Sequence, residues 1–569
     1  MSKRAGLVCF LLLAAVFLIV NRGAYKGFFT DDDFDHLSWT RNASAATFIQ
    51  GLLSPRFQPN NFRPAGHLFY HEEENLFGFD FPKYVAALQL LHLLNVWLVW
   101  LLVRRLGASP LASAAACVFF ALHMGFFDAV WKPAYIFDVL CATFSLLSIL
   151  SWARGRWILS FICFWLAYKT KEPAVMLPFV LACYEIWFGS RKWKPLIPFF
   201  LASFSFGLQG LLLNSNRDNE YTFRFTTDAL AQTGVFYAGR VFLVPYLGFA
   251  LPVALWFARN HRVRFGLAAM LLFFIPMLFL PGRIDNAYCY LPFAALAIAF
   301  AGIAETRHIA LLALFFLLWL PLNLHELRIQ RRETLARDDD ARAWVTAWDR
   351  YARGNTPPDC VIYSGAPAGF GSWGIVGAIK CSYRQAPPDI QPAEQPVHPA
   401  GLDHGRVVFA CWNNSLHKLD IVEHSPQTAD SSFISTTSAT PVWQLEKGWY
   451  GPESGFRWMA PAATARLERP EAATRFQLRV FPNTTLLEKA GPVTIHVSID
   501  DRELEPRLVT QAGWQTLDWS LPPAPAGPVE VSIRTEPPFH PTGDPRTLGI
   551  PVGDFGFMAA LPPPPSGRR

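Results

Sequence analysis

The sequence predicts a polytopic α-helical membrane protein followed by a β-rich region outside the membrane. The chain has 569 residues, of which 52% are hydrophobic and 17% charged, against about 25% charged residues in a typical globular chain. The long apolar runs all lie within residues 5–325, whereas residues 326–569 carry most of the Pro-rich stretches. These observations divide the chain into a membrane domain, 1–325, and a soluble region, 326–569.

Apolar runs long enough to cross a bilayer recur along the first region. A transmembrane helix needs about 20 mostly apolar residues, and about eleven runs approach that length. The first run follows Lys3 and Arg4 and lacks a small-residue cleavage site, so we expect it to be retained as a span. The predicted spans are 5–21, 84–103, 110–124, 135–152, 157–169, 173–189, 195–213, 240–258, 265–281, 288–304 and 308–324.

The charges of the short loops predict how these spans are oriented. Basic residues favour the cytoplasmic side of a membrane, and every basic short loop falls on the same side as Met1. An odd number of spans then places residues 326–569 outside. We therefore expect an integral protein of a bacterial inner (plasma) membrane, with a cytoplasmic N-terminus and a periplasmic C-terminal region. The basic loop residues are Arg104, Arg105, Arg154, Arg156, Arg191, Lys192, Lys194, Arg259, Arg262, Arg264 and Arg307.

The longest loop of the membrane domain, residues 24–83, begins with the acidic stretch "GFFTDDDFDHLSW". Connections longer than about 15 residues usually carry function or are disordered, and this one is too aromatic for a flexible linker. Carboxylates beside a bilayer are costly unless they are solvated, paired or used. A solvated acidic cluster that closes a helix is the alternative interpretation of Asp31, Asp32, Asp33 and Asp35.

Other ionisable residues are predicted on the same outer face. Carboxylates act as general bases on hydroxyl groups or hold a divalent metal, and Lys and Arg bind phosphate. Both kinds of group at the lipid–water boundary suit a lipid-phosphate donor and a hydroxyl acceptor. These residues are Arg63 in the first outer loop, Asp128, Lys132 and Asp138 in the second, Lys171 and Glu172 in the third, and Arg283 and Tyr288 in the fifth.

Five segments in order resemble the GT-C superfamily of polytopic membrane glycosyltransferases, in particular its protein O-mannosyltransferase-like and TMTC-like branch. The resemblance covers residues 5–305. The segments are "FFTDDDFDHL", "FRPAGHLFYHEEENLFGFDFPKYVAALQLLHLLNVWLVWLLVRRLG", "FFDAVWKPAYIFDVLCATFSLLS", "YKTKEPAVMLPFVLACYE" and "RIDNAYCYLP".

The resemblance implies a glycosyltransferase that moves a sugar from a polyprenyl-phosphate donor to a hydroxyl group of a glycan, lipid or protein, with inversion at the anomeric carbon. It leaves room for a divalent cation, Mg or Mn, without requiring one. The catalytic residues would be Asp32 and Asp33, with Asp31 next. Donor phosphate would be bound by Lys171, Arg283, Arg63 and Lys132, with Asp128, Asp138, Glu172 and Tyr288 in support.

Two positions depart from the family pattern. The family usually has Arg two residues before the Asp of the second outer loop, where this chain has Ile136, and often has Arg before the first Tyr of the late motif, where this chain has Ala287. Both changes remove expected contacts to phosphate or sugar. Lys132 and Arg283 lie close enough in sequence to replace them.

Structural interpretations accompany these assignments. Asp128 and Asp138 can pair with Lys132, and the Lys171–Glu172 pair can open a helix at Pro173. At the level of function, two alternatives belong to other classes. One is a transporter or flippase of lipid-linked glycans, and the other is a non-catalytic glycan-binding membrane scaffold.

The soluble region is predicted to contain two modules. Residues 326–439 mix a helical stretch with short strands and indicate an α/β module, and residues 440–569 show the strand spacing of a jelly-roll-like β-sandwich. Trp449 and Trp458 can form a platform for sugars or fill the sandwich core. Among Cys360, Cys381 and Cys411 at most one disulfide can form. No nucleotide-binding motif is present, and nucleic acid is not an expected partner.

Overall fold

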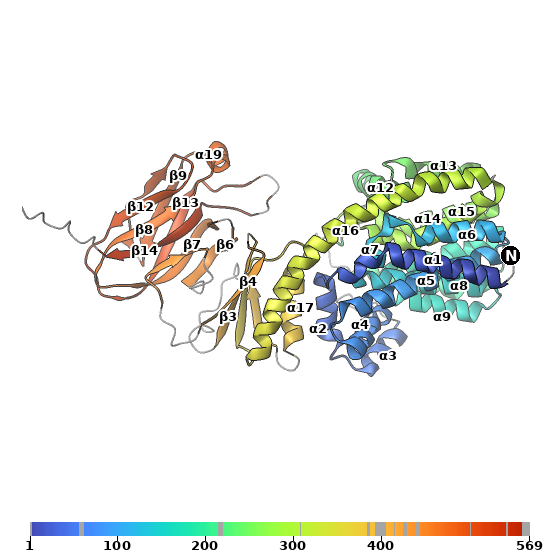
Figure 1. Ribbon diagram of the computed structural model, residues 1–569, viewed down its shortest axis with the longest axis horizontal. Helices are drawn as coiled ribbons and strands as arrows, with labels where there is room; N and C mark the ends of the chain where they lie inside the picture. The colour runs from blue at the N-terminus through green and yellow to red at the C-terminus, as the bar shows by residue number, and fades with distance from the viewer. Residues whose placement is uncertain are drawn as a thin grey trace, which may run out of the picture. The chain divides into compact units, whose positions relative to one another are not determined.

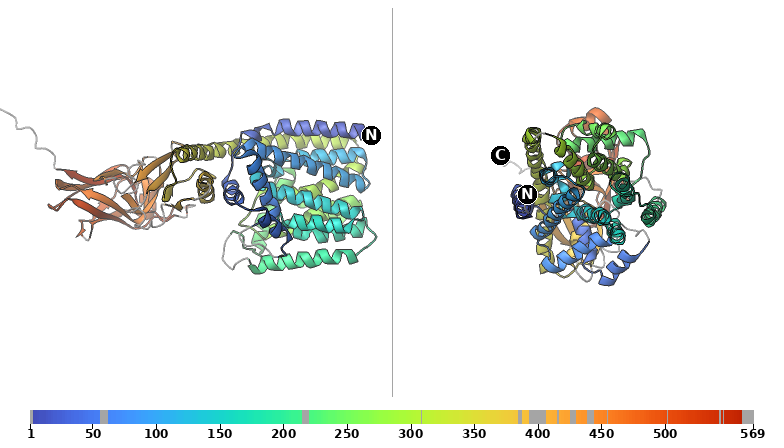
Figure 2. Two further views of the ribbon diagram at one scale, coloured as in Figure 1. Left: turned by 90° about the horizontal axis from the view of Figure 1, so that it is seen from below. Right: turned by 90° about the vertical axis from the view of Figure 1, so that its right-hand side faces the viewer.

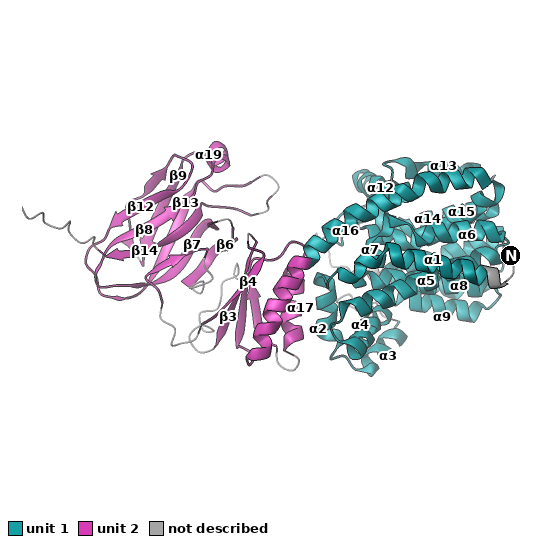
Figure 3. Cartoon of the chain, in the orientation of Figure 1, with its two compact units in different colours: residues 1–338 teal, residues 339–569 magenta. Residues whose placement is uncertain are grey.

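The computed structural model describes residues 3–559, apart from 56–61, 214–219, 308, 384–386, 393–405, 415, 425–429, 438–443, 454, 501, 542–543 and 545. The chain divides into two compact units, residues 1–338 and 339–569 (Figure 3). The first unit is helical and the second is rich in strands (Figure 1). The gap at residues 56–61 falls within the predicted outer loop 24–83.

The long helices of the first unit lie side by side with their axes nearly parallel (Figure 2, left), and they follow the apolar runs of the sequence. Shorter helices of the outer loop run across them. The helices of the unit are α1 (Lys3–Val20), α2 (Asp31–Thr40), α3 (Ala45–Leu53), α4 (Pro64–Phe77), α5 (Phe81–Arg105), α6 (Pro110–Ala121), α7 (Asp128–Trp131), α8 (Ile136–Ala153), α9 (Trp157–Tyr168), α10 (Leu177–Trp187), α11 (Ile197–Leu213), α12 (Thr227–Phe242), α13 (Ala250–Phe257), α14 (His261–Leu278), α15 (Tyr290–Thr306) and the first part of α16 (Ile309–Gly354).

Within the described residues, five helices are long and apolar enough to cross a membrane, or six if one bent pair counts as a span. The five are α5, α8 with the turn before it, α14, α15 with the turn before it, and α16. Gly6–Val20, Pro110–Phe126 and Trp157–Tyr168 are apolar but shorter. Length and composition therefore support several spans, and the predicted number of eleven is not confirmed.

One predicted span, 240–258, is wrong as a single helix. The chain forms α12 and α13 instead, bent by 95° at a short break. Leu243 and Tyr246 have φ angles of 58° and 62°, a left-handed conformation that ends a helix, and Pro245 between them offers no backbone donor. Gly248 allows the chain to turn back tightly, since a Cβ there would lie 2.4 Å from the Ala238 carbonyl oxygen.

The last predicted span, 308–324, is the beginning of a longer element. α16 runs for 46 residues and includes the predicted helical stretch "DDDARAWVTAWDRYA". The boundary between the two compact units falls inside this helix, after Asp338. A continuous helix does not end where its apolar composition ends, because charged residues form helices equally well.

The outer loop 24–83 is folded where the structure describes it. It contains α2, α3 and α4 as well as the 3₁₀ helix η1 (Arg22–Lys26). The end of α2 is tied to α4 by a buried ion pair of 2.8 Å between Arg41 Nη2 and Glu74 Oε1. The entry to α2 is tied to α16, since the Asp338 carboxylate accepts a hydrogen bond of 2.9 Å from Phe28 N.

The second unit begins with the later part of α16, which is followed by a four-stranded sheet of order β2-β1-β3-β4. β1 pairs in parallel with β2 and β3, whereas β4 is antiparallel to β3. These strands and one helix occupy the region predicted as an α/β module. They are β1 (Cys360–Ser364), α17 (Ser372–Ser382), β2 (Asp389–Pro392), β3 (Val407–Asn413) and β4 (Lys418–His424). Cys360, Cys381 and Cys411 are buried free thiols.

The remaining strands form an antiparallel sheet of order β10-β9-β13-β7-β14-β8-β12, to which β5, β6 and β11 add. The beginning of β7 pairs with β14 and its later part with β13, and residues of both halves share one hydrophobic core. Elements are β5 (Phe433–Ser435), β6 (Leu445–Pro452), β7 (Arg457–Arg469), β8 (Ala473–Val480), α19 (Thr484–Ala490), β9 (Val493–Ile499), β10 (Arg502–Glu503), β11 (Arg507–Val509), β12 (Gln515–Ser520), β13 (Gly527–Glu536) and β14 (Pro551–Ala559).

Trp449 and Trp458 belong to this core. They are 3% and 5% exposed, and the Trp449 ring stacks on Phe555 at 5.5 Å between centroids. Of the two interpretations of these aromatic residues, core packing is the one that the structure supports, and neither ring is free to stack on a sugar.

Candidate active site

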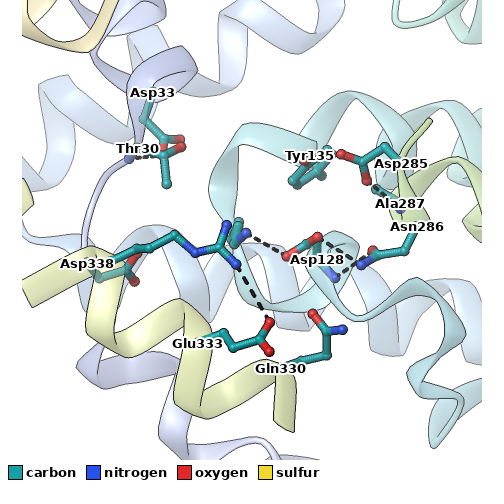
Figure 4. Close-up of polar contacts among 12 residues, drawn as sticks. Thr30, Asp33, Asp128, Tyr135, Asp285, Asn286, Ala287, Gln330, Glu333 and Asp338 are labelled. Atoms are coloured by element: carbon teal, nitrogen blue, oxygen red, sulfur yellow. Dashed lines mark hydrogen bonds and ion pairs between the residues drawn. The ribbon is translucent and has the colours of Figure 1, made fainter. Parts of the chain in front are cut away.

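The acidic stretch begins helix α2. Thr30 is the N-cap and Asp33, three residues later, completes a capping box. Asp33 Oδ2 accepts hydrogen bonds from Thr30 N at 2.7 Å and Thr30 Oγ1 at 2.9 Å, as Figure 4 shows. Its other oxygen accepts from the hydroxyl of Tyr70 on α4 at 2.7 Å. Asp33 is 0% exposed, so it holds α2 in place.

The two neighbouring carboxylates differ from Asp33 in exposure. Asp31 is half-buried and Asp32 is exposed, because successive residues of a helix point about 100° apart. Burial raises the pKa of Asp33 to about 6, against the opposing hydrogen bonds from Thr30 and Tyr70. Of the three predicted catalytic residues, Asp32 is the one whose carboxylate is open to a substrate.

Two ion pairs join α8, the start of α4 and the segment before α10. Asp138 lies in the first turn of α8 and contacts Lys171 Nζ at 2.5 Å. Arg63, at the N-cap of α4, pairs with Glu172 at 3.0 Å. Because Lys171 and Glu172 are consecutive in sequence, the two pairs form one cluster.

Aromatic rings line this cluster. The Arg63 guanidinium lies 5.5 Å from the centre of the Phe137 ring, and Lys171 Nζ lies 4.4 Å from the centre of the Tyr288 ring. Cations over aromatic faces are stabilised further when they are shielded from water. The predicted supporting residue Tyr288 thus lies beside a predicted donor-binding residue.

A second cluster forms where the second and fifth outer loops meet (Figure 4). Asp128 pairs with Lys132 at 2.7 Å and accepts from the Asn286 amide at 2.9 Å. In the other direction, Asn286 Oδ1 accepts a hydrogen bond of 3.1 Å from Asp128 N. The hydroxyl of Tyr135 donates to Asp285 at 2.5 Å. Lys132 therefore neutralises Asp128, as the structural interpretation of this pair expected.

The two clusters share one electrostatic neighbourhood. Burial raises the pKa of Asp285, and the negative charge of Asp128 raises it further. The positive charge of Lys171 acts in the opposite direction. Lys171 is thus close enough to influence Asp285 as well as its own partner, Asp138.

Arg283 lies at the more open side of the site. It pairs with Glu220 at 3.4 Å, and the two side chains are 32% and 54% exposed. Its guanidinium lies 4.7 Å from the centre of the Tyr221 ring, and Tyr288 is among the groups that raise the pKa of Arg283. Burial raises the pKa of the Tyr221 hydroxyl, Arg283 opposes the shift, and the negative charge of Asp32 is among the smaller contributions that raise it.

Tyr221 thus contacts Arg283 directly and also feels the negative charge of Asp32. The sequence motifs alone gave no sign of Tyr221, because its loop matches none of them. Asp285 and Asn286 lie within the recognised "RIDNAYCYLP" segment, but only the structure shows their contacts with Tyr135 and Asp128. Tyr70 was likewise missed, since nothing local marks it as the partner of Asp33.

A pair of histidines also lies at this site. His67 Nε2 and His36 Nδ1 are 3.0 Å apart. Burial, together with the positive charge of Arg63, lowers the pKa of His36 to about 3. Burial also lowers the pKa of His67 well below its ordinary value. Both rings are neutral near pH 7, so they do not add to the positive charge offered to a phosphate.

Within the described part of the chain, no three His, Cys, Asp or Glu side chains form a group that could hold a metal ion. The predicted carboxylates are instead distributed among separate partners, namely Lys171, Lys132 and Arg63. A divalent cation remains an expectation from the sequence.

No protein-family model and no curated protein matches the chain. Solved structures with similar folds include the arabinofuranosyltransferase AftD from Mycobacteria, at 12% identity and a TM-score of 0.47, covering 100% of this chain and 61% of that chain. ArnT from Cupriavidus metallidurans has 13% identity and a TM-score of 0.42, covering 75% and 99%. The Archaeoglobus fulgidus oligosaccharyltransferase has 10% identity and a TM-score of 0.43, covering 98% of each.

These neighbours are glycosyltransferases of the GT-C fold, the superfamily that the sequence resembles. They do not single out the O-mannosyltransferase-like and TMTC-like branch. This chain spans about three fifths of AftD, at 61% of its length. Because the identities and TM-scores are this low, the function proposed below rests on the residues of this chain.

Proposed function

We propose that this protein is a membrane glycosyltransferase that moves a sugar from a polyprenyl-phosphate donor to a hydroxyl group at the outer membrane face. The observation that carries the proposal is that two cations, Arg283 and Lys171, lie over the rings of Tyr221 and Tyr288. The negative charge of the exposed Asp32 also acts on Tyr221. An exposed carboxylate beside cations is what deprotonation of an acceptor and stabilisation of a departing phosphate require.

The three acidic residues have different roles in this proposal. Asp32 is the general base, because it is exposed, whereas both oxygens of Asp33 are engaged by Thr30 and Tyr70. Asp31 lies beside the base and adds negative charge. Attack of the deprotonated acceptor on the anomeric carbon breaks the bond to the phosphate oxygen and inverts the configuration. The proton passes to Asp32, and the lipid phosphate departs with the bonding electrons.

The cations also divide between roles. Arg283 is partly exposed and only loosely paired with Glu220, so it can turn to a phosphate at small cost. Lys171 is tightly paired with Asp138, so it stays in place and contributes a fixed positive charge to the site. Arg63 is held by Glu172 and Lys132 by Asp128 in the same manner. The acceptor is a glycan, a lipid or a protein, and membrane lipids surround the helical unit.

The proposal includes the compartment. The basic short loops favour a cytoplasmic N-terminus, with the acidic loop and residues 326–569 on the outer side. A bacterial inner membrane fits this arrangement, since polyprenyl-phosphate sugars carried in that membrane can be presented at its outer face. A divalent cation is not required by the steps described.

The test is transfer from a radiolabelled polyprenyl-phosphate sugar by the purified full chain in detergent or nanodiscs. Asp32→Asn keeps the size of the side chain but cannot accept a proton. We expect its turnover to fall about a hundred- to ten-thousand-fold, with the melting temperature unchanged. Donors with different sugars, and glycan, lipid and peptide acceptors, are compared in parallel.

Asp35→Asn, in the same acidic stretch, is the matched control and should retain near-normal transfer. If Asp32→Asn also retains it, Asp32 is not the base. If no donor yields a product but the protein moves lipid-linked glycans across proteoliposome membranes, the protein is a transporter and the proposal fails.

A further inference from the structure

Two basic loops lie at the other end of the helices that carry the candidate site. Asp138 is near the start of α8, and the loop between α8 and α9 follows its far end with Arg154 and Arg156. The loop between α10 and α11 contains Arg191, Lys192 and Lys194. We refer to these five residues as the basic patch.

A buried carboxylate joins the two loops. Glu185, near the end of α10, is 4% exposed. It accepts hydrogen bonds of 2.8 Å from Trp152 Nε1 at the end of α8 and from Lys192 N in the other loop. Gly189 lets the chain pass close to it, because a Cβ there would lie 2.3 Å from Glu185 Oε2. The hydrogen bonds of Glu185 therefore hold the two loops next to each other.

Aromatic packing beneath the patch supports the same arrangement. Phe199, at the start of α11, contacts Trp152 at 5.5 Å and Phe161 of α9 at 5.1 Å between ring centroids. The ends of α8 and α10 and the beginnings of α9 and α11 thus converge on one point. The basic patch belongs to the two loops that begin and end at these helices.

The negative charge beside the patch is the carboxylate of Glu185, which is used by Trp152 and the backbone of Lys192 and, among the described residues, forms no side-chain ion pair with the five cations. All five are exposed, and in the described ranges none has an acidic partner. Other basic residues of this membrane face are used differently. Arg105 donates to the Ala153 carbonyl at 2.8 Å and Arg262 to the Leu106 carbonyl at 3.0 Å. Like charges held together in this way repel each other unless an anion lies between them.

The surroundings indicate which anion. Trp157 and Trp193 flank the patch and are 44% and 46% exposed, and exposed Trp residues at helix ends lie at the headgroup level of a bilayer. Arg191 has a φ of 60°, which non-glycine residues seldom adopt. Basic pockets between transmembrane helices on the cytoplasmic side bind anionic headgroups. From this combination we infer a binding site for an anionic phospholipid at the basic patch.

This site does not depend on the proposed transfer reaction. It needs only that the helical unit is embedded in a bilayer, so that the headgroup phosphate meets the cations while the acyl chains lie along α9 and α11. The exposed apolar side chains Ile158, Ile162, Ile197 and Leu201 on these helices, each at least 50% exposed, offer the matching apolar surface.

The experiment titrates the purified full chain with phosphatidylglycerol and counts bound lipids by native mass spectrometry, with phosphatidylcholine as the neutral lipid. Two variants each remove two charges from one loop, namely Arg154→Gln/Arg156→Gln and Lys192→Gln/Lys194→Gln. Each should bind phosphatidylglycerol about thirty-fold more weakly than the wild type, with phosphatidylcholine binding unchanged.

The control variant Arg259→Gln/Arg307→Gln removes two exposed cations from the same membrane face outside the patch, and it should bind like the wild type. Equal losses in patch and control variants would show that only net charge matters, which overturns a defined site. Unchanged binding in both patch variants overturns it as well. Displacement of the lipid by millimolar inorganic phosphate would identify a site for free phosphate instead.

Discussion

At the scale of residues, adjacent aspartates in one stretch differ in how far they are exposed to solvent. The run of three identical side chains cannot show which of them is buried, because that depends on where the helix begins. Because Thr30 is the N-cap, Asp33 is the third residue of α2. There it closes the capping box and accepts a hydrogen bond from the Tyr70 hydroxyl. Asp32 is turned outward by the same geometry.

The buried position of Asp33 predicts an unusual pH dependence of stability. Its pKa is about 6 in the folded protein against about 3.9 in the unfolded chain, so between these values the folded state binds the proton more tightly. The wild type should gain stability relative to Asp33→Asn as pH falls from 7 to 4, by roughly 2 kcal/mol. Melting temperatures of both proteins over this range measure the difference.

The comparison with Asp33→Asn is needed because His36 has the opposite effect. Its pKa of about 3 makes the fold less stable as pH falls, in wild type and variant alike. A gap between the two proteins that stays constant over the range, or that favours the variant in acid, would contradict the burial of an ionisable Asp33.

Arg283 is predicted to act on the donor and not on the fold. Its ion pair with Glu220 is exposed and such pairs contribute about 0–1 kcal/mol, so Arg283→Ala should melt like the wild type. Loss of a charged hydrogen bond to phosphate should raise the donor KM about ten- to a hundred-fold. Glu220→Gln keeps the guanidinium and serves as the control, with a KM equal to or below that of the wild type. An unchanged KM in Arg283→Ala removes Arg283 from the donor site.

At the scale of elements, the sequence predicts helices well where apolar runs are uninterrupted and fails where local geometry decides. The helices α5, α8, α14 and α15 follow predicted spans. The break at Leu243–Tyr246 was missed because two non-glycine residues adopt left-handed φ angles there, which composition does not reveal. The length of α16 was missed because its later part is polar.

The candidate site could also be predicted only in part. The motifs predict which residues are functional, and in the structure Arg63, Asp138, Lys171 and Glu172 form two ion pairs. The partners that hold these groups, such as Tyr135 for Asp285 or Asn286 for Asp128, are contacts across the fold. Their sequence separations of about 150 residues lie beyond any local pattern.

The Lys171–Asp138 pair connects α8 to the segment before α10 and is predicted to serve both fold and function. Lys171→Ala leaves a buried carboxylate without its partner, which typically costs about 3–5 kcal/mol. The double variant Lys171→Ala/Asp138→Ala removes both charges and should recover most of the melting temperature. Transfer should stay low in the double variant if the Lys171 charge supports the departing phosphate.

Recovery of transfer together with stability in the double variant would show that this pair is structural only. A single variant Lys171→Ala that melts like the wild type would contradict the burial of the pair, whose side chains are 10% and 6% exposed.

At the scale of the whole molecule, the distribution of basic loops predicts that residues 339–569 lie outside the cytoplasm. A fluorescent protein that matures only in the cytoplasm should stay dark when fused to the C-terminus, and alkaline phosphatase, active only outside, should be active there. The same two reporters fused in the loop at Arg154–Arg156 should give the reverse result. A fluorescent C-terminal fusion would contradict the orientation.

The contact between Phe28 and Asp338 joins residues 310 positions apart, and this distance along the chain sets an order of events during synthesis. Ribosomes add about 5–20 residues per second, so roughly 15–60 s pass between the emergence of the two partners. Until then the segment leading into the acidic stretch lacks its anchor on α16. A nascent chain that has not reached residue 338 therefore inserts its early helices with an unfinished outer loop, and the site matures only when the last helix of its unit has been made.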